Sequence, residues 1–154
     1  MNRVSPIQVA RADAIASAVL TLQTSGEGFL DITRDVSRFI EDAKAVDGIL
    51  LLFIRHTSAS LVIQENADPD VQTDLVTALR RVAPENADWV HDTEGPDDMP
   101  AHIKAMFNGV CLHVPVSGGR LGLGTWQGIY VAEHRRAPHR REVVLQFLGS
   151  CRDD

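Results

Sequence analysis

Six consecutive apolar residues, Ile49–Ile54, constrain the fold of this chain more than any other segment. Asp47-Gly48 precedes the run and Arg55-His56 follows it, so its length suits a strand better than a helix. A strand that is apolar at every position is typical of one buried on both faces. The rest of the chain therefore has to supply elements that cover this strand.

Two segments carry the spacing of amphipathic helices and a signal for their first residue. Thr33 is the expected N-cap of the first helix. Its apolar stripe consists of Val36, Phe39, Ile40 and Ala43. Asp68-Pro69 begins the second helix, because aspartate caps a helix and proline is tolerated in the first turn. Its stripe consists of Val71, Leu75, Leu79 and Val82.

A third helix is expected to begin at Asp98 or Met99, just before Pro100, and to end at Asn108-Gly109. The residues expected to face the core are Ile103, Met106 and Phe107.

Strand patterns occupy most of the remaining chain, at residues 14–24, 29–32, 59–64, 110–116, 129–135 and 141–148. The order is strand–strand–helix–strand–strand–helix–helix–strand–strand–strand. This order predicts an α+β fold, a single domain over residues 1–154 whose mostly antiparallel sheet packs with about three helices. Residues 1–12 are expected to form a loose N-terminal arm.

The formal net charge of −6, from 15 basic and 21 acidic residues, argues against broad binding to nucleic acid. One basic cluster, interpreted as a solvated hairpin, comprises Arg135, Arg136, His139, Arg140 and Arg141. The two cysteines lack a CxxC spacing, which fits a reducing compartment. The N-terminus has no signal-peptide pattern, and no apolar run approaches the ~20 residues of a membrane helix. We therefore expect a cytoplasmic protein that does not bind membranes.

Two polar segments flank the strand expected at residues 59–64. His56 lies two residues after the apolar run, where a side chain is well placed in a cleft, and the alternative is a capped strand end. Glu65 follows the next strand and has no evident structural role, whereas Asp68 is accounted for as a helix cap. Imidazole and carboxylate are the groups of acid–base catalysis, so His56 and Glu65 are the catalytic candidates.

His91 and His102 bracket the carboxylates of Glu94, Asp97 and Asp98. The two histidines are too far apart in sequence to share one helix face, but they converge if residues 92–100 fold back. Imidazoles with a carboxylate suit a divalent metal. The alternative is that each histidine is an ordinary hydrogen-bonded residue.

The glycine-rich segment 117–128 is typical of a turn whose backbone N–H groups bind an anion. It matches neither a Walker loop nor a dinucleotide-binding fingerprint. The alternative is a tight connection between strands that lets Trp126 pack. The strand expected at residues 129–135 follows, and side-chain alternation along it directs His134 to the face opposite Glu133 and Arg135. The three residues can therefore line one pocket only if a bulge interrupts the alternation or if a neighbouring subunit uses the other face.

Several of these motifs, in this order, resemble the YjbQ family, also called the secondary thiamine-phosphate synthase enzyme family. The resemblance covers about Ser25 to Gly149. It rests on His56-Thr57-Ser58-Ala59, Glu65-Asn66-Ala67-Asp68-Pro69, Glu94–Lys104, Gly124-Thr125-Trp126-Gln127-Gly128-Ile129-Tyr130 and Glu133-His134-Arg135.

The resemblance implies a small α+β domain that assembles as a homotrimer with a polar cleft near the subunit contacts. It also implies a divalent metal such as zinc, held among His91, His102 and His134. The family name implies weak thiamine-phosphate synthase activity, in which a thiazole phosphate and a pyrimidine diphosphate are joined and pyrophosphate leaves.

The first hypothesis is therefore a metal-dependent enzyme acting on a small phosphorylated metabolite, whose phosphate is bound by Gly122, Gly124, Thr125 and Arg135. The alternatives are a non-catalytic trimer that binds a metal or metabolite, and a structural oligomer whose histidines have no ligand.

Overall fold

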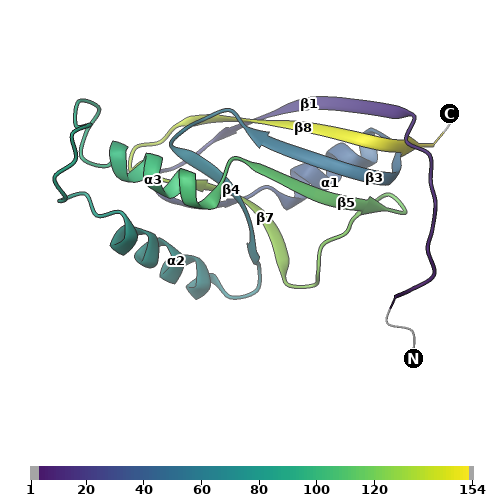
Figure 1. Cartoon of the computed structure of the whole chain (residues 1–154), viewed down its shortest axis with the longest axis horizontal. Helices are drawn as coiled ribbons and strands as arrows, with labels where there is room; N and C mark the ends of the chain where they lie inside the picture. Colours follow the sequence, from purple (N-terminus) through teal and green to yellow (C-terminus); the bar gives the residue numbers. More distant parts are fainter. Residues whose placement is uncertain (1–3, 153–154) are drawn as a thin grey trace.

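Strand β3 (Ala45–Ile54), which contains the apolar run, lies at the centre of a five-stranded sheet and pairs along both edges. The computed structural model describes residues 4–152. The other elements are β1 (Ala14–Gln23), β2 (Gly28–Asp31), α1 (Thr33–Asp42), β4 (Ala59–Glu65), α2 (Pro69–Val82), α3 (Asp98–Asn108), β5 (Cys111–Ser117), β6 (Arg120–Leu121), β7 (Gln127–Glu133) and β8 (Arg140–Cys151) (Figure 1). The order agrees with the predicted one, with the two-residue β6 added.

Two antiparallel sheets organise the chain. The larger has the strand order β1-β8-β3-β5-β6, and the smaller has the order β2-β7-β4. All of their strand pairs are antiparallel. The predicted α+β class, with one domain, a mostly antiparallel sheet and three helices, is confirmed.

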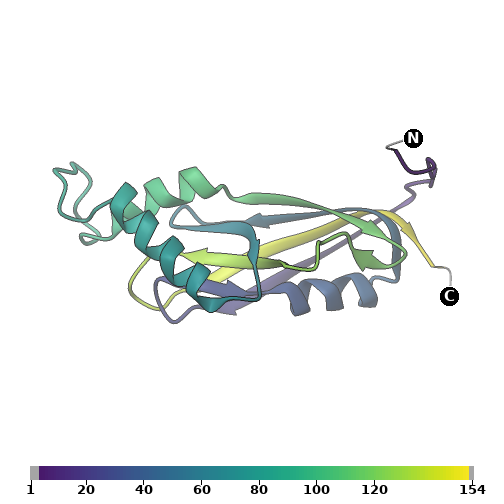
Figure 2. The same ribbon diagram turned by 90° about the horizontal axis from the view of Figure 1, so that it is seen from below.

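The core lies where α1 and the smaller sheet pack against one face of the larger sheet. Val36 and Ile40 of α1, four residues apart, are buried in one cluster with Leu50 of β3 and Phe147 of β8. Figure 2 shows α1 running along the strands, while α2 and α3 lie toward the end of the molecule opposite the chain termini. The helical spacing read from the sequence thus marks the buried face of α1.

The expectation that β3 is buried on both faces holds for one face only in the protomer. Leu50, Leu52 and Ile54 are buried, but Ile49 and Phe53 on the other face are 45% and 40% exposed. Alternation of side chains along the strand separates the two sets. The protomer therefore leaves an apolar strand face uncovered.

The two helix starts differ in how well the sequence predicted them. Asp68 caps α2 as expected, since its Oδ1 accepts a hydrogen bond from the backbone N–H of Asp70 at 2.9 Å. Thr33 is not the N-cap of α1. It is the first helical residue, and its N–H donates to Asp31 Oδ1 at 2.8 Å, while its own hydroxyl accepts from the N–H of Ile129 at 2.9 Å.

The predicted inward face of α3 is wrong at two of its three residues, whereas the third, Ile103, is half-buried. Met106 and Phe107 are 73% and 63% exposed, whereas Asp98 and Lys104 are buried. Both buried charges have ion-pair partners, and burying charged groups is tolerable when they are paired. The buried face of α3 therefore consists of these two paired charges and the small apolar residues Pro100, Ala101 and Ala105.

Residues 4–12 precede β1 as an exposed segment with little regular structure, in line with the predicted arm. Positions 1–3 of that arm lie outside the described residues. Among the helices of residues 4–152, none is long and apolar enough to cross a membrane.

Gly48 of β3 and Gly149 of β8 face each other across the sheet, and we predict that Gly149→Ala destabilises the fold. A Cβ at position 149 would overlap the carbonyl oxygen of Asp47 and the ring of Phe147. Overpacking of this kind costs about 1–3 kcal/mol, measurable as a lower free energy of unfolding in urea. Gly124→Ala is the control, because a Cβ there meets only the Gln127 side chain at 3.4 Å. Equal stability of both variants would contradict the prediction.

Candidate metal centre and its surroundings

Helix α3 and the loop before it bring two histidines onto one carboxylate. Asp98 and His102 are four residues apart in α3, so their side chains lie on one helix face. The loop between α2 and α3 returns His91 to the same face. Asp98 Oδ2 lies 2.7 Å from His91 Nε2 and 3.4 Å from His102 Nε2. The two imidazole rings, with centroids 5.6 Å apart, therefore converge as the sequence suggested.

His102 is oriented by a hydrogen bond through its other nitrogen. Its Nδ1 lies 3.0 Å from the carbonyl oxygen of Thr57, which can only accept, so Nδ1 carries a proton. In the neutral ring Nε2 then directs its lone pair toward Asp98 Oδ2. Two acceptors at 3.4 Å repel each other unless a proton or a metal cation lies between them.

Within residues 4–152, His91, Asp98 and His102 form the one group of three or more metal-ligating side chains whose ligand atoms meet, all within 4.8 Å of one another. His91 and His102 were expected as ligands from the family resemblance. Asp98 was noted only as one of three carboxylates between them. The signal that identifies it is the Asp98-x3-His102 spacing in a helix that begins at Asp98.

Arg135 ties the acidic start of α3 to the end of β7. Its guanidinium donates to Asp97 Oδ2 at 3.1 Å, to Asp98 Oδ1, and to the carbonyl oxygen of Glu94 at 2.8 Å. Asp98 thus has one oxygen on Arg135 and the other facing the histidines. Burial alone would raise the pKa of Asp97, but hydrogen bonds from the backbone N–H of Arg136 and from Arg135 outweigh it and lower that pKa.

His134 points elsewhere in the protomer. It is buried, and its Nε2 lies 2.8 Å from Ser60 Oγ. Burial, followed by the positive charge of Lys104, lowers its pKa to about 4. It lies outside the group formed by His91, Asp98 and His102.

His56 belongs to a second polar network, built on a buried ion pair. Arg141 donates to both carboxylate oxygens of Glu133, at 2.6 and 2.7 Å. His56 Nε2 accepts from the backbone N–H of Glu142 at 2.9 Å, and its Nδ1 faces Arg141 at 3.4 Å. Burial and then the Arg141 charge lower the pKa of His56, which favours the neutral ring. Arg141 was expected in a solvated hairpin, but it is buried because Glu133 partners it.

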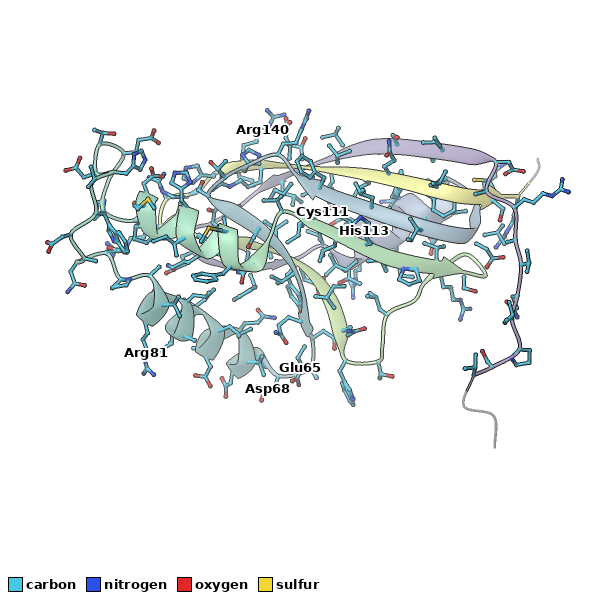
Figure 3. All side chains as sticks on the ribbon, viewed as in Figure 1. Glu65, Asp68, Arg81, Cys111, His113 and Arg140 are labelled. Atoms are coloured by element: carbon cyan, nitrogen blue, oxygen red, sulfur yellow. The ribbon has the colours of Figure 1, made fainter. Side chains whose placement is uncertain are left out.

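Glu65 and the glycine-rich loop lie at the far end of β4 and β7 from the histidine pair. Glu65 pairs with Gln127, whereas Ala59 pairs with Glu133 near Arg135. Seven residues of strand separate these ends by about 20 Å. Figure 3 shows Glu65 near the first turn of α2, beside Asp68. The protomer therefore does not bring Glu65 to His91 and His102.

Two backbone N–H groups of the expected anion site already have partners. Gly122 donates to the carbonyl oxygen of Pro115 at 2.7 Å, and Gly124 donates to Gln127 Oε1 at 2.8 Å. These bonds fit the alternative reading of a tight connection between strands, although Trp126 is exposed rather than packed in the protomer. Thr125 is also exposed.

The low pKa of His134 predicts pH-dependent stability. Because its pKa falls from 6.5 in the unfolded chain to about 4 in the folded protein, the unfolded chain binds a proton that the folded protein does not at intermediate pH. Stability should fall as the pH drops from about 6.5 toward 4, by up to about 3 kcal/mol from this group. NMR titration of the imidazole tests this directly, and a midpoint near 6.5 would contradict it. Urea unfolding of His134→Gln should show a shallower pH dependence than the parent protein.

Known proteins match this chain over most of its length. A sequence profile described as UPF0047 protein YjbQ-like matches residues 18–150. A UPF0047 protein of Synechocystis is 44% identical over 132 residues, 85% of this chain and 90% of that protein. The UPF0047 protein YjbQ of Escherichia coli O157:H7 is 41% identical over 131 residues, 84% of this chain and 95% of its own length.

Solved structures show the same fold. A YjbQ/UPF0047 protein of Clostridium acetobutylicum superposes with a TM-score of 0.79 at 38% identity, over 84% of this chain and 98% of that one. A hypothetical protein of Aeropyrum pernix K1 superposes with a TM-score of 0.81 at 31% identity, over 88% and 99% of the two chains. With matches of this extent in both sequence and structure, the chain belongs to the YjbQ (UPF0047) family.

Proposed function

We propose that this protein is a metal-dependent enzyme that acts on a phosphorylated metabolite, with a divalent metal such as zinc bound by His91, Asp98 and His102. The observation that carries the proposal is the position of His102, whose Nδ1 is committed to Thr57 and whose Nε2 faces a carboxylate oxygen. Either a proton or a metal cation between these two acceptors would remove their repulsion, and we propose that a metal takes this place because His91 brings a third ligand to the same point.

The three side chains suit such an ion in type and in spacing. Ligands of a tetrahedral zinc lie roughly 3.3 Å apart, given bonds of about 2.0–2.1 Å. The 3.4 Å between Asp98 and His102 matches this separation. The 2.7 Å between Asp98 and His91 would have to open by roughly 0.6 Å, and His91 lies in an exposed loop that permits such a shift.

Three protein ligands leave a coordination position for water or substrate, which distinguishes catalytic from structural zinc sites. A bound metal would supply Lewis-acid stabilisation of a phosphoryl oxygen. Arg135 lies next to the ligand Asp98, and its planar guanidinium suits a phosphate. It would place that group against the centre.

For the reaction, we propose the weak thiamine-phosphate synthase activity implied by the family name. A bond forms between the thiazole phosphate and the pyrimidine diphosphate at the carbon that carries the diphosphate. The bond from this carbon to the diphosphate oxygen breaks at the same time, and pyrophosphate leaves with its electron pair. The developing charge on the leaving group needs a nearby cation, which a metal held by His91, Asp98 and His102 would supply.

We further propose that the chain acts as a homotrimer formed through the outer face of the larger sheet. Ile15, Leu148 and Ile49 lie side by side across β1, β8 and β3, and each is at least 45% exposed. Val19 of β1 and Phe53 of β3 are also exposed, and both pair with the half-buried Val144 of β8, which makes a second apolar row on this face. In this arrangement a neighbouring subunit covers the exposed face of β3. The apolar run would then be buried on both faces, as the sequence predicts.

We propose that Glu65 and Thr125 reach the metal centre of a neighbouring subunit in such a trimer, because Glu65 lies at the far end of β4 from the centre of its own chain. The second candidate function, a non-catalytic trimer that binds a metal or metabolite, is favoured by the distance between Glu65 and the centre within one protomer. Turnover decides between the two candidates.

We expect His91→Ala and His102→Ala each to lose the bound zinc, because two of three ligands do not hold the ion tightly. Elemental analysis of the purified protein, together with calorimetric titration of zinc, measures this loss. His139→Ala is the control, since it removes an imidazole from the β7–β8 hairpin and not from the centre. Zinc bound equally by all three variants would refute the assignment.

The same proteins serve to test the reaction. The parent should form thiamine phosphate from the thiazole phosphate and pyrimidine diphosphate, and the two centre variants should not. A metal-loaded parent without turnover would leave only the binding function.

The trimer predicts that Ile49→Glu yields monomers, since a charge would then have to be buried in the interface at a high desolvation cost. Light scattering coupled to size-exclusion chromatography gives the mass of the parent and the variant. Val82→Glu places the same charge on exposed apolar surface of α2 and should leave the assembly unchanged. A monomeric parent, or an intact trimer in Ile49→Glu, would rule out this interface.

A further inference from the structure

A second polar site lies beside the C-terminal end of α2, apart from the metal centre. A pocket of about 490 Å³ is lined there by Arg80 of α2, Lys104 of α3 and Arg136 after β7, together with Glu85, Asn86 and the backbone around Pro84. Three cationic side chains therefore converge on one hollow of a chain whose net charge is −6.

Lys104 is the least expected of these cations, because its side chain is only 3% exposed. Its Nζ makes one hydrogen bond, to Glu27 Oε1 at 2.6 Å. An ammonium group has three N–H donors, and among residues 4–152 no other hydrogen-bond acceptor for it is found. Two N–H donors of Lys104 therefore remain for oxygen atoms of solvent or of a ligand in the pocket that this residue lines.

Arg80 and Arg136 are tethered yet accessible. Arg80 reaches Glu27 Oε2 at 2.6 Å, and Arg136 reaches Glu85 Oε2 at 2.6 Å, with side-chain exposures of 62% and 66%. Each guanidinium has five N–H donors, more than one carboxylate can accept. The three cations exceed the two carboxylates by one positive charge, so the pocket attracts an anion.

We propose that this pocket binds the phosphate group of a small molecule. A phosphate has three terminal oxygens, which can accept from Lys104, Arg80 and Arg136 approaching from three different elements. The side chain of Asn86 adds an amide donor at the rim.

The site is separate from the metal centre. Lys104 follows His102 by two residues, about 200° around the helix, and so projects from the opposite side of α3. Phosphate binding here requires no metal and stands independently of the proposed reaction.

The test is titration of the metal-stripped full-length protein with inorganic phosphate and with pyrophosphate, followed by calorimetry and by amide chemical shifts. Arg80→Gln and Arg136→Gln should each weaken binding about tenfold or more, since each removes charge-assisted hydrogen bonds. Arg81→Gln is the matched control: Arg81 neighbours Arg80 but projects from the outer side of α2 and does not line the pocket (Figure 3).

The amide shifts should gather around residues 80–86, 104 and 136. Absence of binding at millimolar phosphate, equal affinity in Arg81→Gln and Arg136→Gln, or shifts confined to residues 122–125 would each overturn the proposal. Lys104 and Glu27 remain unchanged in these variants, so their fold is not at risk from an orphaned buried charge.

Discussion

A buried charge without a partner is costly. The charged residues near the end of β7 and in α3 are therefore paired with carboxylates, and these ion pairs connect α3 to the neighbouring strands. Arg135 contacts Asp97 and Asp98 at the start of α3, while Lys104, two turns later, contacts Glu27 beside β2. These contacts, together with the buried Ala101 and Ala105, hold α3 against the rest of the fold. One oxygen of Asp98 is thereby committed to Arg135, and the other is left facing two imidazoles. The candidate metal centre is a consequence of the way α3 is anchored.

At this end of the molecule, three successive polar side chains, Glu133, His134 and Arg135, point into three different environments. Glu133 turns to Arg141, His134 turns to Ser60, and Arg135 turns to the acidic start of α3. Neighbouring residues along an extended chain point to opposite sides, so residues adjacent in sequence are directed to different environments. A motif of three consecutive polar residues therefore does not identify one site.

Several features of the fold were predictable because each depends on local sequence. The buried stripe of α1, the Asp68 cap of α2 and the end of α3 at Gly109 follow from residue spacing and cap chemistry within one element. The pairing of β3 along both edges follows from its apolar run. The outward position of Met106 and Phe107 did not follow, since the buried face of α3 carries small apolar residues and two charges whose partners lie far away in sequence.

By itself, the sequence determined the α+β order of elements, the family and the two histidines that meet, because these depend on local periodicity and on motifs in a fixed order. Only the tertiary structure decided that Asp98 joins them, that His134 does not within the protomer, and that Glu65 and the glycine-rich loop lie at the other end of β7. The physical reason is that a ligand set depends on distances between elements and on the rotation of each. Both are set by long-range packing and charge pairing, which the spacing of residues along the chain does not contain.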